Sequence, residues 1–363
     1  MRITIDATSL LVRSAGVKNY TYYWLAHLRR QARPGEEIAG YPFEGRPEGP
    51  DAKLNHEASP LSAWSTALRL GLVYGVNRLG PSALDTALGR TDVFHASNLV
   101  RHAPRRAKLT ATIHDLTAFL MPELHTPATV RADRFFAERI LKRAEGLIAV
   151  SENTRQDAIR MLGIAPERIT TIHSGVAEAY FDAVPVRRAK RYVLYVGSIE
   201  PRKNLPALLD AWGSLRPDLR DAFELVTAGP MGWADQSIRD RIRAETAYLG
   251  YVPESELPGL TAGAAAFVYP SLYEGFGFPV AQAMAAGVPV ITSNVSSLPE
   301  IAGEAALLVD PRSSGELAAA LTRLLESESL RGELCRRGRA RAQSYRWERC
   351  AAESLEFFRR IAG

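Results

Sequence analysis

The chain is 363 residues long, and 46% of its residues are hydrophobic, 23% charged and 8% aromatic. These proportions exclude an intrinsically disordered chain and a fibrous repeat, and the length favours two domains over one. The formal charge of +5 at pH 7 is modest evidence for an anionic partner.

Short apolar runs bounded by Gly, Pro, Asp or Ser alternate with helix-length amphipathic segments along the whole chain. This alternation predicts buried parallel strands covered by helices on both faces. The expected strands of the first half are Arg2–Ala7, Glu37–Tyr41, Val93–Ala96, Leu109–His114, Gly146–Val150 and Ile169–His173. Those of the second half are Tyr192–Gly197, Glu224–Ala228, Ala265–Tyr269, Pro289–Thr292 and Ala306–Val309.

A charged stretch separates the two halves. Tyr180–Arg191 contains Pro185 and the run RRAKR, which interrupts the apolar pattern and favours a linker. We therefore expect an α/β fold of two doubly wound, Rossmann-like domains, over residues 1–184 and 185–346, facing across a cleft. Ligands of such sheets bind at the carboxyl ends of the strands, so function is expected in strand-to-helix loops. Residues 44–60, rich in Pro, Gly and Glu, are expected to form a mobile excursion.

Two loops of the first half carry candidate ligand-binding residues. In SAGVKNYT, which follows the first strand, Gly16 permits backbone amides to approach a phosphate, although a small-residue turn without a ligand is equally open. His114 and Asp115 end the run LTATIHD, and a side chain at this end of a parallel strand faces the ligand crevice. His114 is either a ligand-binding group or a core histidine bonded to backbone, and the same two interpretations hold for His95.

Two basic clusters follow in the chain. The first contains Arg101, Arg105, Arg106 and Lys108; the second surrounds Phe135, Phe136, Ile140 and Leu141 with Arg131, Arg134, Arg139, Lys142 and Arg143. The second cluster has helical spacing with an apolar side, so it is suited to the surface of an anionic membrane. The alternative is a helix whose apolar side faces the core and whose basic side faces solvent.

In the second half, GSIEPRKN follows the apolar strand YVLYV and precedes an amphipathic helix. Arg202 and Lys203 lie at the opening of that helix. A guanidinium fork and a compact ammonium group there would neutralise a diphosphate. A solvated basic turn is the alternative.

The segment PSLYEGFGFPVAQAMAAG, which follows the run AAFVY, contains the largest group of candidate ligand-binding residues. Gly275 and Gly277 allow a close backbone approach, and Pro279 suits the first turn of a helix. A helix N-terminus is a natural seat for phosphate. Because Glu274 would repel a phosphate, its carboxylate is better explained by sugar hydroxyls; the alternative is a tight turn with an acidic helix cap.

These loops, in this order, resemble the group one glycosyltransferases, often called glycosyltransferase family four, and specifically their mannosyltransferase-like bacterial members. The resemblance covers nearly the whole chain. It is carried by SAGVKNY, FHAS, IHDL, AVSENT, IHSGV, GSIEPRKN, LGYVPESELPGL, PSLYEGFGFPVAQAMAAG, SSLPEIAG and LLVDP.

The resemblance implies a GT-B enzyme that transfers a sugar from a nucleotide diphosphate with retention of anomeric configuration, without a metal or other cofactor. It places Arg202 and Lys203 on the donor phosphates, and His114 against the transferred sugar. It also implies that the final helix, residues 347–363, packs back on the N-terminal domain. The remaining implied contacts are Gly16 with the phosphates, Glu274, Gly275, Phe276, Gly277 and Phe278 with the donor sugar, Val252 with the base, and Glu300 near the nucleotide.

Two positions depart from the family pattern. The family has a second Glu on the helix after the glycine loop to bind ribose, and this chain has Gln282, which loses the charge-assisted hydrogen bond. The Arg that commonly follows the glycine of the phosphate loop is Ser198 here, and Arg202 is its expected substitute. Weaker donor binding is the predicted consequence.

The expected function is transfer of a hexose, with GDP-mannose as donor, to a glycan or polyprenol-linked glycan in bacterial surface polysaccharide synthesis. One rival, motivated by Ser198 and Gln282, is a catalytically silent GT-B protein that binds a nucleotide or supports a partner transferase. A second rival keeps the fold and changes the reaction, as in sugar-nucleotide epimerases or glycogen-type synthases. No nucleic-acid partner is expected.

The sequence also bears on location. Cys335 and Cys350 are the only cysteines and fit neither a disulfide framework nor zinc-ligand spacing, as in a reducing cytoplasm. The N-terminus MRITIDATSLLV reads as a buried strand rather than a signal peptide, and no apolar run is long enough to span a bilayer. We therefore expect a cytoplasmic protein that contacts the inner face of the membrane.

Overall fold

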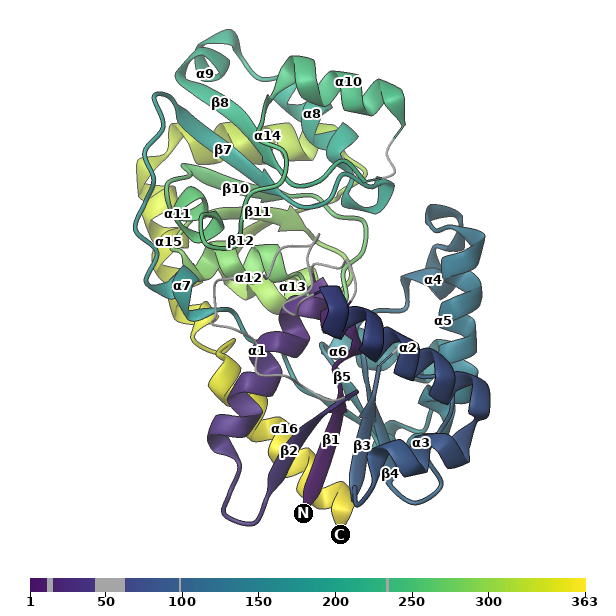
Figure 1. The fold of residues 1–363 in the computed structure, drawn as a ribbon. Helices are drawn as coiled ribbons and strands as arrows, with labels where there is room; N and C mark the ends of the chain where they lie inside the picture. The colour runs from purple at the N-terminus through teal and green to yellow at the C-terminus, as the bar shows by residue number, and fades with distance from the viewer. Residues whose placement is uncertain (12–15, 43–62, 98, 233–234) are drawn as a thin grey trace. The chain divides into compact units, whose positions relative to one another are not determined.

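The structure, a computed structural model, describes residues 1–11, 16–42, 63–97, 99–232 and 235–363. It divides into two compact units, Met1–Gly175 with Trp347–Gly363, and Val176–Arg346. Each unit holds a six-stranded sheet with flanking helices (Figure 1). The excursion expected at residues 44–60 lies outside the described residues.

The first sheet has the strand order β2-β1-β3-β4-β5-β6, and all of its pairings are parallel. Its strands differ from the expected ones only at their ends. They are β1 (Arg2–Asp6), β2 (Glu37–Tyr41), β3 (Val93–Ala96), β4 (Lys108–Ile113), β5 (Gly146–Ala149) and β6 (Ile169–Thr171). Strands β3 and β5 are buried along their whole length, as parallel strands covered on both faces must be.

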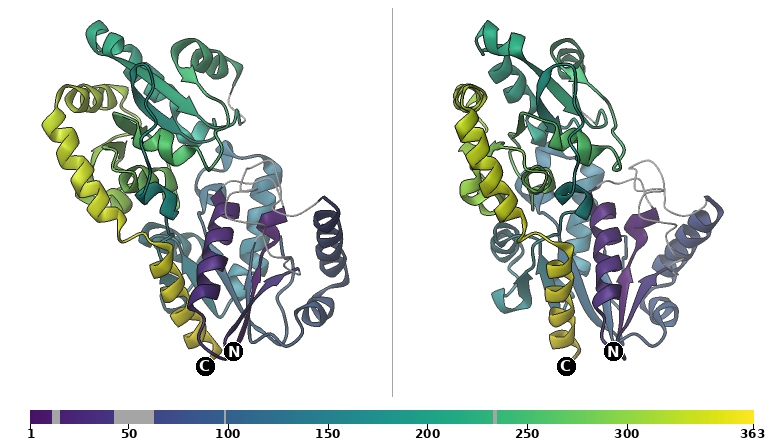
Figure 2. Two further views of the ribbon diagram at one scale, coloured as in Figure 1. Left: turned by 60° about the vertical axis from the view of Figure 1, so that its left-hand side comes forward. Right: turned by 90° about the vertical axis from the view of Figure 1, so that its left-hand side faces the viewer.

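Helices pack on this sheet through apolar stripes. They are α1 (Gly16–Gln31), α2 (Ala63–Leu79), α3 (Pro81–Leu88), α4 (Thr117–Leu120), α5 (Pro127–Arg139), α6 (Glu152–Leu162) and α16 (Trp347–Ala362). Helix α16 lies along α1 in both views of Figure 2, and the Trp24 indole N–H donates to Ser354 Oγ at 2.9 Å. The last helix therefore belongs to the first unit.

The boundary expected after residue 184 is wrong: the first unit ends at Gly175. Val176 forms a parallel bridge with Arg346, and its N–H donates to Tyr345 O at 2.8 Å. Helix α7 (Glu178–Phe181) then packs against helices of the second unit. The charged stretch that interrupts the apolar pattern is thus a surface segment of the second unit rather than the junction.

The second sheet has the order β12-β11-β10-β7-β8-β9 and is also parallel. Its strands are β7 (Arg191–Val196), β8 (Phe223–Ala228), β9 (Ala247–Tyr248), β10 (Ala266–Tyr269), β11 (Val290–Ser293) and β12 (Ala306–Val309). Strand β9 was not expected, because two residues are too short to show a period. Strands β7 and β10 are neighbours, so the loops that leave their carboxyl ends meet.

The helices of the second unit cover both faces of this sheet (Figure 1). They are α8 (Leu205–Gly213), α9 (Pro217–Ala222), α10 (Gln236–Glu245), α11 (Leu257–Ala262), α12 (Phe278–Ala285), α13 (Leu298–Ala302), α14 (Ser314–Glu326) and α15 (Glu328–Ala342). Among them α12 is the most deeply buried for its length, with Val280, Ala281 and Met284 inaccessible to solvent. Its first turn follows directly from the glycine loop after β10.

Candidate functional site in the second unit

The loops after β7 and β10 are bonded to each other. The Leu272 N–H donates to Arg202 O at 2.8 Å, and Asn204 Nδ2 donates to Pro270 O at 3.1 Å. Asn204 adopts a left-handed conformation (φ 57°), which ends the short 3-10 turn Pro201–Lys203 and starts α8. This geometry aims Arg202 and Lys203 at the β10 loop.

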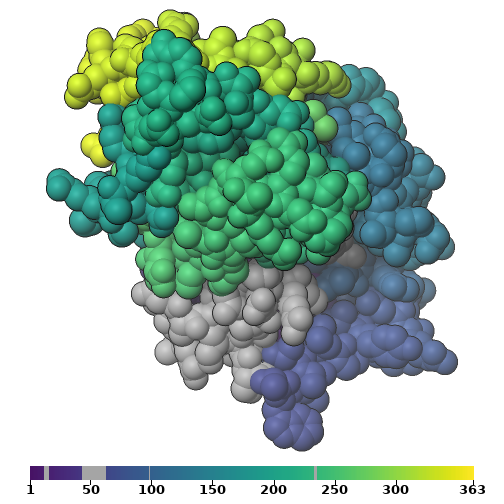
Figure 3. All heavy atoms as spheres, turned by 90° about the horizontal axis from the view of Figure 1, so that it is seen from above, coloured from purple at the N-terminus to yellow at the C-terminus, as the bar shows by residue number. Residues whose placement is uncertain are grey.

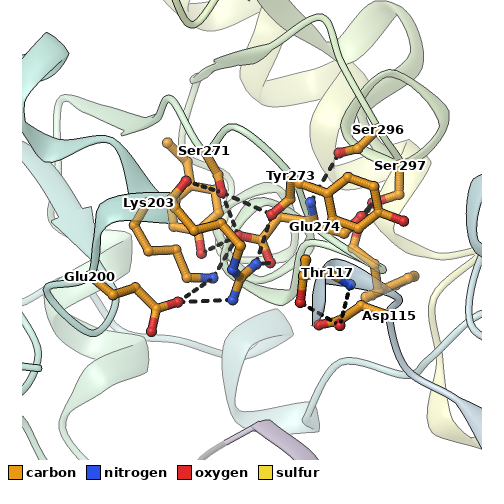
Figure 4. Close-up of polar contacts among 12 residues, drawn as sticks. Asp115, Thr117, Glu200, Lys203, Ser271, Tyr273, Glu274, Ser296 and Ser297 are labelled. Atoms are coloured by element: carbon orange, nitrogen blue, oxygen red, sulfur yellow. Dashed lines mark hydrogen bonds and ion pairs between the residues drawn. The ribbon is translucent and has the colours of Figure 1, made fainter. Parts of the chain in front are cut away.

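Four charged side chains meet there, and we call Glu200, Arg202, Lys203 and Glu274 the charge cluster. Figure 4 shows Glu200, Lys203 and Glu274 pointing toward one another. Lys203 Nζ lies 2.6 Å from Glu274 Oε1, and Arg202 Nη1 lies 3.1 Å from Glu274 Oε2. Arg202 Nη2 lies 2.9 Å from Glu200 Oε1. Two of these residues, Arg202 and Lys203, were predicted to act on phosphate and one, Glu274, on sugar; Glu200 was not predicted.

Burial and charge act in opposite directions on this cluster. Burial by itself would raise the pKa of Glu274, but the adjacent charges of Arg202 and Lys203 hold that pKa at about 2. Burial lowers the pKa of Lys203, and the charge of Glu274 opposes that change. Two cations and two carboxylates carry no net charge, so the cluster cannot attract a diphosphate by excess charge alone. Its contribution must come from donors held in fixed positions.

Lys203 retains such donors. Its ammonium group has three protons, and it donates one hydrogen bond to Glu274 at 2.6 Å among the described residues. The Tyr269 hydroxyl and Ser271 Oγ also lie within 3.0 Å and 2.7 Å of Glu274 Oε1. Sequence reasoning missed both hydroxyls, because Tyr269 read as a buried strand residue and Ser271 as part of the turn.

The glycine loop is held by two serines. Ser296 Oγ accepts from the Glu274 N–H at 3.0 Å. Ser297 Oγ lies 2.9 Å from Glu274 O and 3.0 Å from Phe276 O, and its side chain is fully buried. Gly277 has φ 96°, and a Cβ there would lie 2.7 Å from Leu298 Cδ2. The conformation of the loop before α12 therefore depends on glycine at position 277 and on the hydroxyl group of Ser297, which bonds to the loop carbonyls.

We predict that Ser297→Ala distorts this loop. The substitution leaves two buried carbonyl groups without their hydroxyl donor, which costs about 1–3 kcal/mol in unfolding free energy. A rise in KM for the donor larger than the fall in kcat is expected, because the loop would position the donor. Ser344→Ala, at a half-buried position just after the end of α15, is the matched control. Equal donor KM in both variants would contradict the prediction.

The other predicted donor contacts are dispersed over the second unit. Ser198 follows β7 at the same sheet edge, and Val252 lies in the loop after β9, both half-buried. Gln282 lies on α12, half-buried, and its carbonyl accepts from the Ala286 N–H. Glu300 lies in the first turn of α13, where its carbonyl oxygen accepts from Tyr345 and Arg341.

In the first unit, His114 directly follows β4, and its ring lies edge-on to Tyr20 with 4.8 Å between centroids. Burial lowers the pKa of His114 to about 4, so the ring is neutral at pH 7. A neutral imidazole can exchange a hydrogen bond with a hydroxyl but does not supply positive charge. Asp115 accepts from Thr117 N–H and Oγ1 at 3.1 and 2.7 Å and thereby starts α4.

His95 is a core residue. Its ring nitrogens lie 3.0 Å from Thr110 Oγ1 and 2.9 Å from Thr112 Oγ1. Burial lowers its pKa to about 3, and the ring packs on Trp24 and Phe358. Of the two interpretations left open for this histidine, the structural one applies. Gly16, by contrast, is the exposed first residue of α1, with nothing near the position of a Cβ.

The apolar side of the second basic cluster faces the core. Ile140 and Leu141 are 0% and 3% exposed, and Phe136 packs against the same core. Only Phe135, 40% exposed, departs from this arrangement, and Arg101 and Arg139 lie over its ring. Among the described residues no helix is both long and apolar enough to cross a membrane.

Comparisons with known proteins agree with the fold. The two parallel-sheet units have the GT-B fold. The chain aligns over 99% of its length with sucrose-phosphate synthase of Thermosynechococcus elongatus (98% of that chain, TM-score 0.74, 19% identity). Residues 15–180 match the family described as Glycosyltransferase Family 4, and residues 176–343 match Glycosyl transferases group 1.

The similarity extends to curated relatives. The O-antigen chain mannosyltransferase B of Escherichia coli is 34% identical over 283 residues, which is 74% of each chain. A serotype-specific mannosyltransferase of the same organism is 26% identical over 70% of this chain and 34% of its own longer chain. The protein belongs to the group 1, family 4 glycosyltransferases and is similar to mannosyltransferases of that family.

Proposed function

We propose that the protein transfers mannose from GDP-mannose, with retention of configuration and without a metal ion, to a growing polysaccharide on a polyprenol carrier. The observation that supports this most is the charge cluster, in which Lys203 and Arg202 are held at the carboxyl ends of β7 and β10. The names of the relatives, an O-antigen chain mannosyltransferase among them, favour mannose as the sugar.

Breaking the bond between the anomeric carbon and phosphate puts negative charge on the leaving diphosphate. Fixed donors that meet this charge lower the barrier. In the proposed reaction Lys203 and Arg202 donate to the diphosphate together with the N-terminus of α12, while Glu274 accepts from sugar hydroxyls. The acceptor hydroxyl attacks on the face from which the diphosphate leaves, and no side chain is assigned as a covalent nucleophile.

The remaining groups orient the donor in this scheme. Neutral His114 exchanges a hydrogen bond with the transferred sugar, and Gly16 brings backbone near the phosphates. Gln282 binds ribose, Glu300 lies near the nucleotide, and Val252 contacts the base. Ser198 stands where the family has an arginine, and Arg202 takes over its charge. We place the reaction at the cytoplasmic face of the membrane, where a polyprenol carrier would present its glycan.

A thermal-shift series tests the donor. We expect GDP to raise the melting temperature more than UDP or TDP at equal concentration, because binding to the native state alone stabilises it. GDP-mannose should then release mannose, and EDTA should leave the rate unchanged if the cluster replaces a metal. A larger shift with UDP would assign another donor, and a rate abolished by EDTA would overturn metal independence.

A catalytically silent GT-B protein remains the second candidate, because Gln282 and Ser198 weaken the expected donor contacts. Calorimetry with nucleotide diphosphates and a donor-hydrolysis assay separate the two. Nucleotide binding without any sugar release, and no gain of activity in Gln282→Glu, would favour the silent protein. Increased donor affinity in Gln282→Glu together with turnover in the unmodified enzyme would favour catalysis.

A further inference from the structure

Helix α2 presents an unusual surface. Trp64, Leu68, Tyr74 and Leu79 are 83%, 70%, 69% and 77% exposed. Its core side is formed by Val73 and Val76, both nearly inaccessible to solvent. At 3.6 residues per turn, Trp64 and Leu68 lie on one face, away from those two valines, and Tyr74 and Leu79 lie on either side of that face. Single exposed apolar residues are common on soluble proteins, but a group of this size on one helix marks an interaction site.

The same surface carries positive charge. Helix α2 has no Asp or Glu, and its Arg78 is exposed on the face of Trp64 and Leu68. The other arginine of the helix, Arg69, lies four residues before Val73 and is therefore on the core side. Asn77 fixes the first basic cluster to the last turn of α2: its Oδ1 accepts from the Arg101 N–H at 3.1 Å, and its Nδ2 donates to Leu99 O at 3.0 Å. Residues 99–108 likewise contain no acidic side chain.

Arg101 also connects α2 with α5. Its guanidinium carbon lies 5.9 Å from the centre of the Phe135 ring, and that of Arg139 lies 5.6 Å from the same ring. We call Trp64, Leu68, Tyr74, Arg78, Leu79, Arg101 and Phe135 the α2 surface. In Figure 3 the side chains of α2 form the lower edge of the face shown.

We propose that the α2 surface docks on an anionic lipid bilayer. Trp and Tyr favour the level of the headgroups, and Leu side chains enter the acyl boundary. Arginine side chains near an anionic membrane surface are attracted to its headgroups. A second copy of this chain would bring like charges together, which disfavours self-association through this surface. The proposal rests on the proposed function in one respect: a polyprenol-linked acceptor would place the enzyme at a bilayer.

The test uses the full chain with phosphatidylcholine vesicles that contain or lack phosphatidylglycerol. Cosedimentation should occur with the anionic vesicles and weaken as salt is raised, because the arginine contribution is screened. Leu68→Glu should lower the apparent affinity by about tenfold or more, since a carboxylate replaces an inserted side chain and faces anionic lipid. Val184→Glu, at a valine that is 80% exposed in the second unit, is the matched control and should bind as the unmodified chain does.

Trp64 supplies a second readout. Trp24, Trp212 and Trp347 are buried, so insertion of Trp64 into lipid should shift the fluorescence maximum of the chain to shorter wavelength. Trp64→Phe should abolish the shift while vesicle binding persists, and Trp233→Phe should retain it. Equal binding to both vesicle types, or a shift that survives Trp64→Phe, would overturn the proposal. So would a dimer that Leu68→Glu dissociates, because a second copy would then cover the surface.

These outcomes are separable from failure of the proposed function. If GDP-mannose supports no transfer while the unmodified chain binds anionic vesicles through Trp64, the donor assignment fails and the lipid surface stands. Both proposals are supported by two results together. Leu68→Glu and the unmodified enzyme should release mannose from the donor in solution at equal rates, and only the variant should lose vesicle binding.

Discussion

Replacement of Lys203 by Ala should lower turnover by about a hundredfold or more, the usual effect of removing one fixed donor from a developing oxyanion. The Nζ atom of Lys203 lies 2.6 Å from Glu274 and 4.0 Å from Glu200, so its position is set by two carboxylates. A flexible surface lysine would have to be ordered during the reaction, whereas Lys203 is already held in place. We therefore expect its removal to cause a large loss of turnover. Steady-state kinetics with GDP-mannose would measure it.

Two controls make the Lys203 result specific. Lys142→Ala removes an exposed lysine that pairs with Glu138 four residues earlier, and it should leave turnover unchanged. Because Lys203 is buried, a melting curve must also show that the Lys203→Ala variant is folded. Near-normal turnover in a folded Lys203→Ala enzyme would remove this residue from the proposed mechanism.

Replacement of Glu274 by Ala should destabilise the second unit by about 3–5 kcal/mol, because Lys203 and Arg202 would be left buried beside one carboxylate instead of two. Loss of sugar transfer is expected as well, since the variant lacks the group that would accept from the sugar hydroxyls. Urea denaturation measures the first effect and the donor-release assay the second. Glu353→Ala, which breaks the exposed pair with Arg349, should change stability by less than about 1 kcal/mol.

The pH dependence of stability follows from the same carboxylate. The pKa of Glu274 is held at about 2, below its ordinary value of 4.5, so the unfolded chain binds the proton more readily than the folded one. The stabilisation from Glu274 is therefore complete above about pH 4.5 and is lost as the pH falls from there towards 2. Glu274→Gln should flatten the unfolding free energy against pH in that window. If the unfolding free energy depended on pH in the same way in Glu274→Gln and in the unmodified protein, the low pKa assigned to Glu274 would be contradicted.

The positions of the strands were predictable because each one is a short run of apolar and β-branched residues between turn formers. Strand β9 was missed because two residues carry no period. The chemistry of the two loops indicated Arg202, Lys203 and Glu274 as candidate residues. It did not show that the three side chains contact one another. That proximity depends on β7 and β10 lying side by side although their loops are far apart in the sequence.

Exposure was harder to predict than secondary structure. Ile140 and Leu141 pack in the core, whereas Trp64 and Leu68 on α2 face outward. The segment around Phe135 was expected to be helical with an apolar side, and no expectation was stated for the α2 segment. Hydrophobic periodicity shows which side chains share a face without showing what covers that face. The surface that now carries the lipid proposal was therefore not recognised in the sequence.

Local sequence was sufficient for the alternating strands and helices, the glycine turn before α12 and the family, since each depends on residues adjacent in the chain. Tertiary structure alone decided the rest. His95 and His114 occupy similar places at the ends of neighbouring strands, yet Thr110 and Thr112 from β4 bind His95 as a core residue. The pKa of Glu274 depends in the same way on partners from another loop, because charges and hydroxyl groups act through space and not along the chain.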